Sequence, residues 1–140
     1  MSERGPIVLD ASLALAWCFK DEADARSEAV KDRVKIFGAV VPTLWHLEVA
    51  NILTLAERRG RLSPTQLAAR IEGLAELPIT VDEETPARAF HDIAALARAE
   101  KLTTYDAAYL ELAMRLGAPL ATRDAELVLA ARRVGVEVFG

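Results

Sequence analysis

The chain has 140 residues, of which 52% are hydrophobic, enough to form a buried core and to exclude a disordered or purely linking protein. Its 21 acidic residues outnumber 17 basic ones, giving a net charge of −4, so the composition does not predict broad electrostatic binding of nucleic acid. The one cysteine, Cys18, excludes an internal disulfide and a cysteine-based zinc site, and no apolar run approaches the ~20 residues that a membrane span needs. Because residues 1–6 lack a secretory signal pattern, we expect one cytoplasmic domain over residues 1–140 with no membrane partner.

Short β-type runs alternate with longer helical patterns along the chain. The first run is continuously apolar, which is typical of a strand buried on both faces. The elements expected in chain order are a strand at 6–9, helices at about 11–19 and 24–36, a strand at 39–41, helices at 43–59 and from 63 onward, a strand at 79–81, helices at about 85–99 and 104–116, a strand at 119–121, a helix at 124–133 and a strand at 136–138.

Cap residues mark several helix ends. Ser63-Pro64 is typical of a helix start, with Ser as the N-cap and Pro in the first turn, and Thr85-Pro86 repeats this pattern. Gly117 is typical of the residue that follows a helix. Strands separated by helices pair in parallel through right-handed crossovers. We therefore predict a three-layer α/β sandwich, in which helices cover both faces of a five-stranded parallel sheet.

Two aspartates are expected at the edge of the sheet where ligands bind. In an open α/β sheet that edge lies beyond the carboxyl ends of the strands. Asp10 follows the first strand directly, and Asp124 follows the fourth by three residues. A capping role at a helix N-terminus would explain either aspartate alone equally well.

Glu48 is the only charged side chain, with His46 neutral, between Leu44 and Leu53. On a helix it shares a face with Leu44 and Asn51. An ionised carboxylate in apolar surroundings needs a partner, because removing it from water is costly. The alternatives are a buried salt bridge to an arginine and a cation site shared with other acids.

Asp106 falls in the first turn of the helix expected at 104–116, where the helix dipole alone favours an acid. The four acids are more informative together than singly. Bringing carboxylates within ~4 to 6 Å costs on the order of a few kcal/mol per close pair at an effective dielectric constant of about 20. A divalent cation, or protonation of some groups, would offset that repulsion. Oxygen-only ligands suit Mg²⁺ or Mn²⁺, which can activate water and clamp a phosphodiester for in-line displacement.

Four segments resemble those of the PIN-domain family, and the closest likeness is to the VapC-type toxins of toxin–antitoxin pairs. The segments are residues 7–17, 48–51, 105–109 and 120–124. The likeness covers nearly the whole chain and keeps the four segments in the family's order. It implies a sheet with strand order 3-2-1-4-5 and an endoribonuclease that depends on Mg²⁺ or Mn²⁺.

The same resemblance implies which residues form the site. The catalytic, metal-binding acids of the family match Asp10, Glu48, Asp106 and Asp124. Small polar positions that orient carboxylates and water in similar proteins match Ser12, Asn51, Thr104 and Thr122. Arg123 departs from the family pattern, and it could contact RNA phosphate, pair with an acid or be solvated. The implied partners are an RNA substrate, a second copy of the chain in a homodimer and a cognate VapB-type antitoxin.

Other classes of protein fit the sequence less well. A phosphoacceptor signalling domain needs paired acids after the first strand and a late lysine, whereas Asp10 stands alone and Lys101, the last lysine, precedes the fourth strand. A metal-free mechanism with two histidines is disfavoured, because His46 points away from Glu48 and His91 lies in a polar stretch. A non-catalytic PIN-like interaction domain stays open, and stabilisation by Mg²⁺ would separate it from a nuclease.

Overall fold

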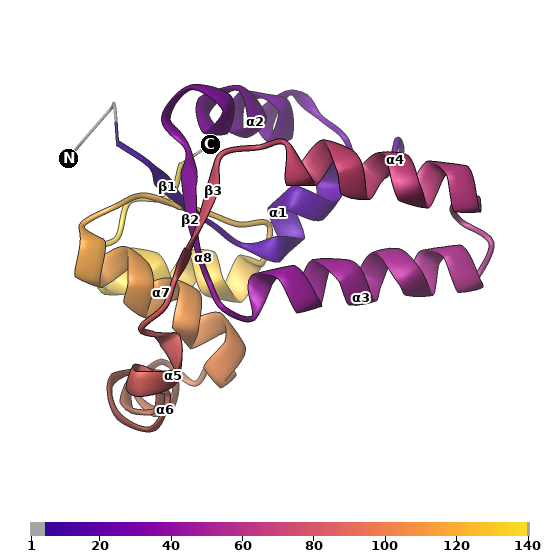
Figure 1. Cartoon of the computed structure of the whole chain (residues 1–140). Helices are drawn as coiled ribbons and strands as arrows, with labels where there is room; N and C mark the ends of the chain where they lie inside the picture. Colours follow the sequence, from indigo (N-terminus) through magenta and orange to yellow (C-terminus); the bar gives the residue numbers. More distant parts are fainter. Residues whose placement is uncertain (1–4, 140) are drawn as a thin grey trace.

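The computed structural model describes residues 5–139, in which strands and helices alternate (Figure 1). Residues 1–4, which form most of the segment that lacks a secretory signal pattern, and residue 140 lie outside this described part. The strands are β1 (Ile7–Leu9), β2 (Ala39–Pro42), β3 (Ile79–Asp82) and β4 (Leu120–Ala121). They form one sheet in the order β3-β2-β1-β4, and every neighbouring pair is parallel. The predicted parallel α/β sheet is therefore confirmed.

The helices lie where the sequence predicts them, with ends that shift by a few residues. They are α1 (Ala11–Ala16), α2 (Ala25–Phe37), α3 (Trp45–Arg58), α4 (Pro64–Ala75), α5 (Thr85–Arg88), the π-helix η1 (Ala89–Ile93), α6 (Ala94–Glu100), α7 (Thr104–Leu116) and α8 (Ala125–Arg133). Figure 1 shows α3 and α4 side by side as a pair that extends away from the sheet. Among residues 5–139, no helix combines the length and apolarity needed to cross a bilayer.

The centre of the sheet is covered on both faces. Ile7, Val8 and Leu9 are all 0% exposed. Because successive side chains of a strand point to opposite faces, three consecutive buried residues need packing partners on each side. On one face, α7 packs against β1 and β2. This arrangement fixes the start of α7 beside the carboxyl end of β1.

The prediction of a five-stranded sheet is wrong. Residues 136–138, expected as the fifth strand, contribute one isolated parallel bridge between Val138 and Leu120. Leu120 N donates to Glu137 O at 2.8 Å, and Phe139 N donates to Leu120 O at 2.9 Å. A longer ladder does not form because β4 itself has only two residues before the chain turns toward α8. The described residues thus give the strand order 3-2-1-4, with the chain end beside β4 where a fifth strand was expected.

The helix predicted at 85–99 differs in detail. Ser63 caps α4 in a capping box with Gln66, as expected. Thr85, by contrast, is already the first residue of α5, and its hydroxyl donates to the Asp82 carbonyl instead. The helix also changes to π geometry at Ala89–Ile93 before it continues as α6. Apolar periodicity did not reveal this change, because a π-turn alters the helix by a single residue.

Candidate active site

Asp10 leaves the carboxyl end of β1 and is the N-cap residue of α1. Its side chain is held by two hydroxyls: Ser12 Oγ donates to Oδ2 at 2.7 Å, and Thr122 Oγ1 donates to the same oxygen at 2.6 Å. The residue is only 5% exposed. Burial raises the pKa of Asp10, the hydrogen bonds from Thr122 and Ser12 act in the opposite sense, and the charge of Asp124 raises it further.

The pairing of β4 with β1 brings the segment after β4 next to Asp10. Thr122 is completely buried, and its hydroxyl also accepts a hydrogen bond from the Asp124 backbone N–H at 3.0 Å. Asp124 caps α8, since its Oδ1 accepts from the N–H groups of Glu126 and Leu127 at 2.9 and 3.1 Å. The cap uses one carboxylate oxygen, and no hydrogen bond among the described residues engages Oδ2. A capping role and a ligand role are therefore compatible at Asp124.

Glu48 lies in the first turn of α3 and is half-buried. Its Oε1 accepts a hydrogen bond of 2.5 Å from the Tyr109 hydroxyl. No arginine within residues 5–139 forms a salt bridge with Glu48, so the alternative of a buried arginine partner is not found. Burial raises the pKa of Glu48, the bond from Tyr109 opposes that rise, and the charge of Asp10 adds to it.

Asp106 lies in the first turn of α7, where the Thr103 hydroxyl caps its backbone N–H at 3.1 Å. Its own carboxylate accepts no hydrogen bond and forms no ion pair with any residue that the structure describes. Burial raises the pKa of Asp106 from 3.8 to about 6, and the charges of the other three acids contribute to this rise. Asp106 is thus the least compensated carboxylate of the four.

The four acids, which we call the acidic site, gather at one edge of the sheet. They come from the end of β1, α3, α7 and the segment after β4: Asp10, Glu48, Asp106 and Asp124. As they stand, no three His, Cys, Asp or Glu side chains in the described chain are close enough together to hold a metal ion. The donor chemistry nevertheless fits a hard divalent cation, since the groups offered are carboxylate and hydroxyl oxygens. A bound cation would supply the attraction that these mutually repelling carboxylates lack.

The small polar residues matched to the family divide into two pairs. Ser12 and Thr122 both contact Asp10, and the Arg123 backbone N–H donates to Ser12 Oγ at 3.0 Å, which ties the segment after β4 to the start of α1. Asn51 and Thr104 are exposed. Within residues 5–139, neither side chain forms a hydrogen bond with the acidic site. The structure therefore brings only one of the two pairs to the acids.

The Arg123 side chain binds the connection between α1 and α2. Its Nη1 donates to the Glu22 carbonyl at 2.7 Å, and its Nη2 lies 3.6 Å from Asp24 Oδ2. Of the alternatives that the sequence left open, the structure favours pairing with an acid. His46 and His91 are both exposed, as expected for residues outside the site.

Tyr109 is the residue that sequence reasoning missed. It belongs to the segment 105–109 that carries the family resemblance, but no role was predicted for it. Two signals were available: Tyr109 follows Asp106 by three residues and so shares its helix face, and a tyrosine in an apolar helix needs a partner for its hydroxyl. The identity of that partner, Glu48, requires the tertiary fold.

Comparison with known proteins places the chain among relatives of similar length. A model of the PIN domain family matches residues 7–133. Ribonuclease VapC3 from Pyrobaculum aerophilum is 31% identical over 121 residues, which is 86% of this chain and 91% of that protein. PAE2754 from Pyrobaculum aerophilum has a similar solved structure, with a TM-score of 0.70 at 22% identity over 93% of this chain and 87% of that one. FitAcB from Neisseria gonorrhoeae gives 0.66 at 19% identity over 96% of both chains. At these identities the two structures share the fold.

Proposed function

Because the chain belongs to the PIN-domain family, we propose that it is a metal-dependent endoribonuclease that cleaves RNA phosphodiester bonds as the toxin of a toxin–antitoxin pair. The observation that carries this proposal is the acidic site: four carboxylates from separate elements repel one another there, and none forms an ion pair with a lysine or arginine among residues 5–139. The relationship to Ribonuclease VapC3 supports RNA as the substrate class. The net charge of −4 makes a cation a necessary part of the proposal, since an acidic pocket repels a phosphodiester.

In the proposed site, Asp10 and Asp106 would be the main ligands of Mg²⁺ or Mn²⁺, and Glu48 and Asp124 would hold metal-bound water or a second ion. When bound, the ion lowers the pKa of a water and offsets the charge of the scissile phosphate. The Ser12 and Thr122 hydroxyls fix the carboxylate of Asp10. Thr122 also links that carboxylate to the backbone of Asp124, so the two acids keep their relative positions.

The proposal includes the partners that the family likeness implies. They are a cognate VapB-type antitoxin that blocks the nuclease and a second copy of the chain in a cytoplasmic homodimer. Support for the antitoxin comes from the relationship to Ribonuclease VapC3. Co-expression with any small reading frame that adjoins the gene, followed by purification and measurement of the mass of the complex, would test both partners together.

The decisive experiment neutralises the two direct ligands one at a time. We expect Asp10→Asn and Asp106→Asn each to lower the rate of RNA cleavage by ~100-fold or more while the protein stays folded. The assay uses chelator-treated protein, a fluorescent RNA, and added Mg²⁺ or Mn²⁺, with circular dichroism as the check on folding. Asp32→Asn, the same change at an exposed position of α2, is the matched control and should keep full activity.

Two outcomes would contradict the proposal. Full cleavage by Asp106→Asn would remove that residue from the site, and cleavage that persists in excess chelator would remove the metal. A wild-type protein that neither cleaves RNA nor gains stability from Mg²⁺ would favour the non-catalytic interaction domain instead.

A further inference from the structure

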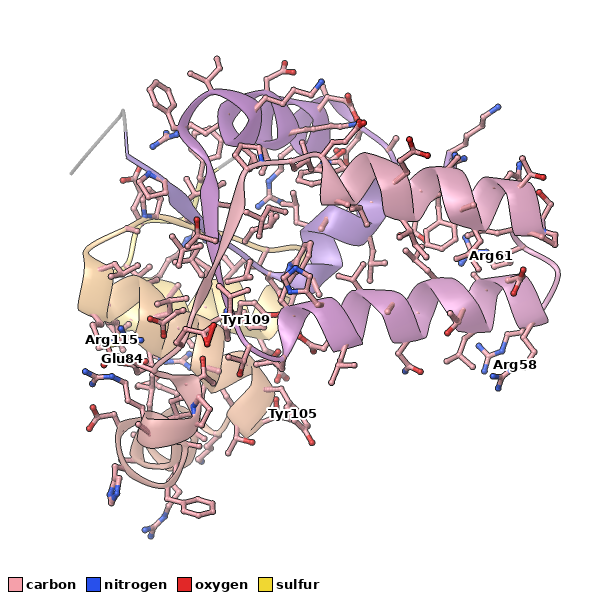
Figure 2. All side chains as sticks on the ribbon, in the orientation of Figure 1. Arg58, Arg61, Glu84, Tyr105, Tyr109 and Arg115 are labelled. Atoms are coloured by element: carbon pink, nitrogen blue, oxygen red, sulfur yellow. The ribbon has the colours of Figure 1, made fainter. Side chains whose placement is uncertain are left out.

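Tyr109 joins three parts of the acidic site through one buried side chain. It lies in α7, which also carries Asp106, and it is 0% exposed. Its hydroxyl donates to Glu48 Oε1 on α3 at 2.5 Å, and the charge of Asp10 at the end of β1 acts on the same hydroxyl. Figure 2 shows Tyr109 in the interior, whereas Tyr105 from the same helix lies at the surface.

Within the described part of the chain, this hydrogen bond is the only one to the Glu48 carboxylate. Among residues 5–139 no other side chain or backbone group donates to Glu48, although it is half-buried. A hydrogen bond from a neutral hydroxyl to a carboxylate is charge-assisted and therefore short and strong. It engages Oε1 and leaves Oε2 without a partner in the described chain. The bond therefore limits the orientations of a long, flexible side chain whose carboxylate feels the charge of Asp10.

We propose that Tyr109 is a positioning residue of the metal site: its hydroxyl fixes the carboxylate of Glu48 so that the free oxygen serves the cation. This inference rests on the proposed function, because it assigns a purpose to a contact within the same site. Groups that hydrogen-bond to metal ligands commonly tune metal affinity by fixing ligand orientation. A purely structural role would instead consist of mutual satisfaction of two buried polar groups.

The test compares Tyr109→Phe with Tyr105→Phe. Both changes remove one phenolic hydroxyl from α7, but only the first removes a contact with the site. The Phe ring keeps the shape of the buried side chain, and half-buried Glu48 can still be hydrated, so we expect Tyr109→Phe to fold. Thermal unfolding in chelator, where no metal contributes, checks this expectation.

The readout is the dissociation constant for Mn²⁺, measured on metal-free protein from the electron paramagnetic resonance signal of the free ion. We expect Tyr109→Phe to weaken Mn²⁺ binding by about tenfold and Tyr105→Phe to leave it unchanged. The same change in a Glu48→Gln background should weaken binding by less than about twofold, because Tyr109 acts through the carboxylate of Glu48. RNA cleavage should show a lower kcat in Tyr109→Phe at saturating RNA.

Each remaining outcome overturns the inference in a distinguishable way. Equal Mn²⁺ affinities of the wild type and Tyr109→Phe would show that the hydroxyl does not position the ligand. A tenfold loss that persists in the Glu48→Gln background would show that Tyr109 acts through the fold. If the wild type itself bound no Mn²⁺ and cleaved no RNA, the proposed function would fail first. If the wild type and Tyr105→Phe bind Mn²⁺ and cleave RNA, the proposed function holds regardless of the result for Tyr109→Phe.

Discussion

Two groups of four carboxylates lie near opposite ends of α7, and the protein compensates only one of them. The acidic site surrounds the first turn of the helix. The second group, which we call the arginine network, consists of the acids Asp82, Glu84, Asp92 and Glu111 with the cations Arg88 and Arg115. Figure 2 shows Arg115 and Glu84 side by side near the C-terminal end of α7.

The arginine network is built from close contacts. Arg115 Nη2 lies 2.7 Å from Asp82 Oδ2, and its Nε lies 3.0 Å from Glu111 Oε2. Hydrogen bonds to these two acids raise the pKa of Arg115. In the acidic site, by contrast, no lysine or arginine among residues 5–139 forms an ion pair with any of the four carboxylates. Among the described residues, the protein thus pairs the carboxylates of the arginine network with internal cations and leaves those of the acidic site unpaired, which is the pattern that the proposed cation site requires.

The largest expected effect on stability comes from removing a cation from the arginine network. Arg115→Met would leave Asp82 and Glu111, whose side chains are 14% and 10% exposed, without their main partner. We expect the free energy of unfolding to fall by ~3 kcal/mol, because a mostly buried charge then stays unpaired. Urea denaturation measures this loss, and RNA cleavage per folded molecule should be retained.

Arg132→Met is the matched control for this experiment. It makes the same chemical change at an exposed position in the last turn of α8, where we expect a loss below ~0.5 kcal/mol. If Arg115→Met lost no more stability than Arg132→Met, the buried ion pairs of the arginine network would not stabilise the fold. The contrast with the unpaired carboxylates of the acidic site would then have no energetic basis.

Removing a charge from the acidic site should raise the free energy of unfolding rather than lower it. The pKa of Asp106 is about 6 in the folded protein against an ordinary 3.8, so between these pH values the folded state keeps a proton that the unfolded state has lost. The free energy of unfolding therefore falls as pH rises through this window and stays low above it. Asp106→Asn avoids this loss of stability, because an asparagine does not ionise. For a fully buried group, a pKa change of this size corresponds to ~3 kcal/mol of free energy of unfolding. Because solvent screens half-buried Asp106, we expect Asp106→Asn to gain only about 1 kcal/mol near neutral pH.

The pH dependence is the control for Asp106→Asn. In chelator, urea denaturation should show the gain at neutral pH and its disappearance below pH ~3, where Asp106 is protonated in both the folded and the unfolded state. Adding Mg²⁺ at about 100 times its dissociation constant, which stabilises a binding protein by ~2.7 kcal/mol, should reverse the order, because only the wild type binds the ion well. A variant that is no more stable than the wild type at neutral pH would contradict the view that the site is uncompensated.

Much of the acidic site could be predicted from the sequence because it depends on local rules. Asp10 and Asp124 follow parallel strands, and the carboxyl ends of parallel strands meet at one edge. The pairing of β1 with β4 then places the two aspartates together. Glu48 was identifiable as a charge that needs a partner. Its partner was not, since Tyr109 lies 61 residues away and helical spacing relates residues only within one helix.

The wrong prediction has a similar cause. Residues 136–138 alternate like a strand, but whether they pair along their length depends on how far β4 extends. β4 ends at Ala121 because Thr122 and Asp124 are drawn into contacts around Asp10. The same long-range contacts that build the site thus shorten the strand on which a fifth strand would pair. Residue patterns along one segment do not contain that information.

The smallest expected effect is at ion pairs that resemble the arginine network in chemistry but not in burial. Arg61 lies 3.4 Å from Asp21, with the two side chains 46% and 75% exposed. We expect Asp21→Asn to change the free energy of unfolding by less than ~0.5 kcal/mol, because water and salt screen an exposed pair. Arg61→Gln should cost more, since the guanidinium also covers the Phe19 ring at 4.1 Å from its centre. Urea denaturation at low and high salt would separate the two contributions. A loss at Asp21 as large as that in Arg115→Met would mean that charge pairing stabilises this fold regardless of burial, and the uncompensated carboxylates of the acidic site could then no longer be read as a place kept open for a cation.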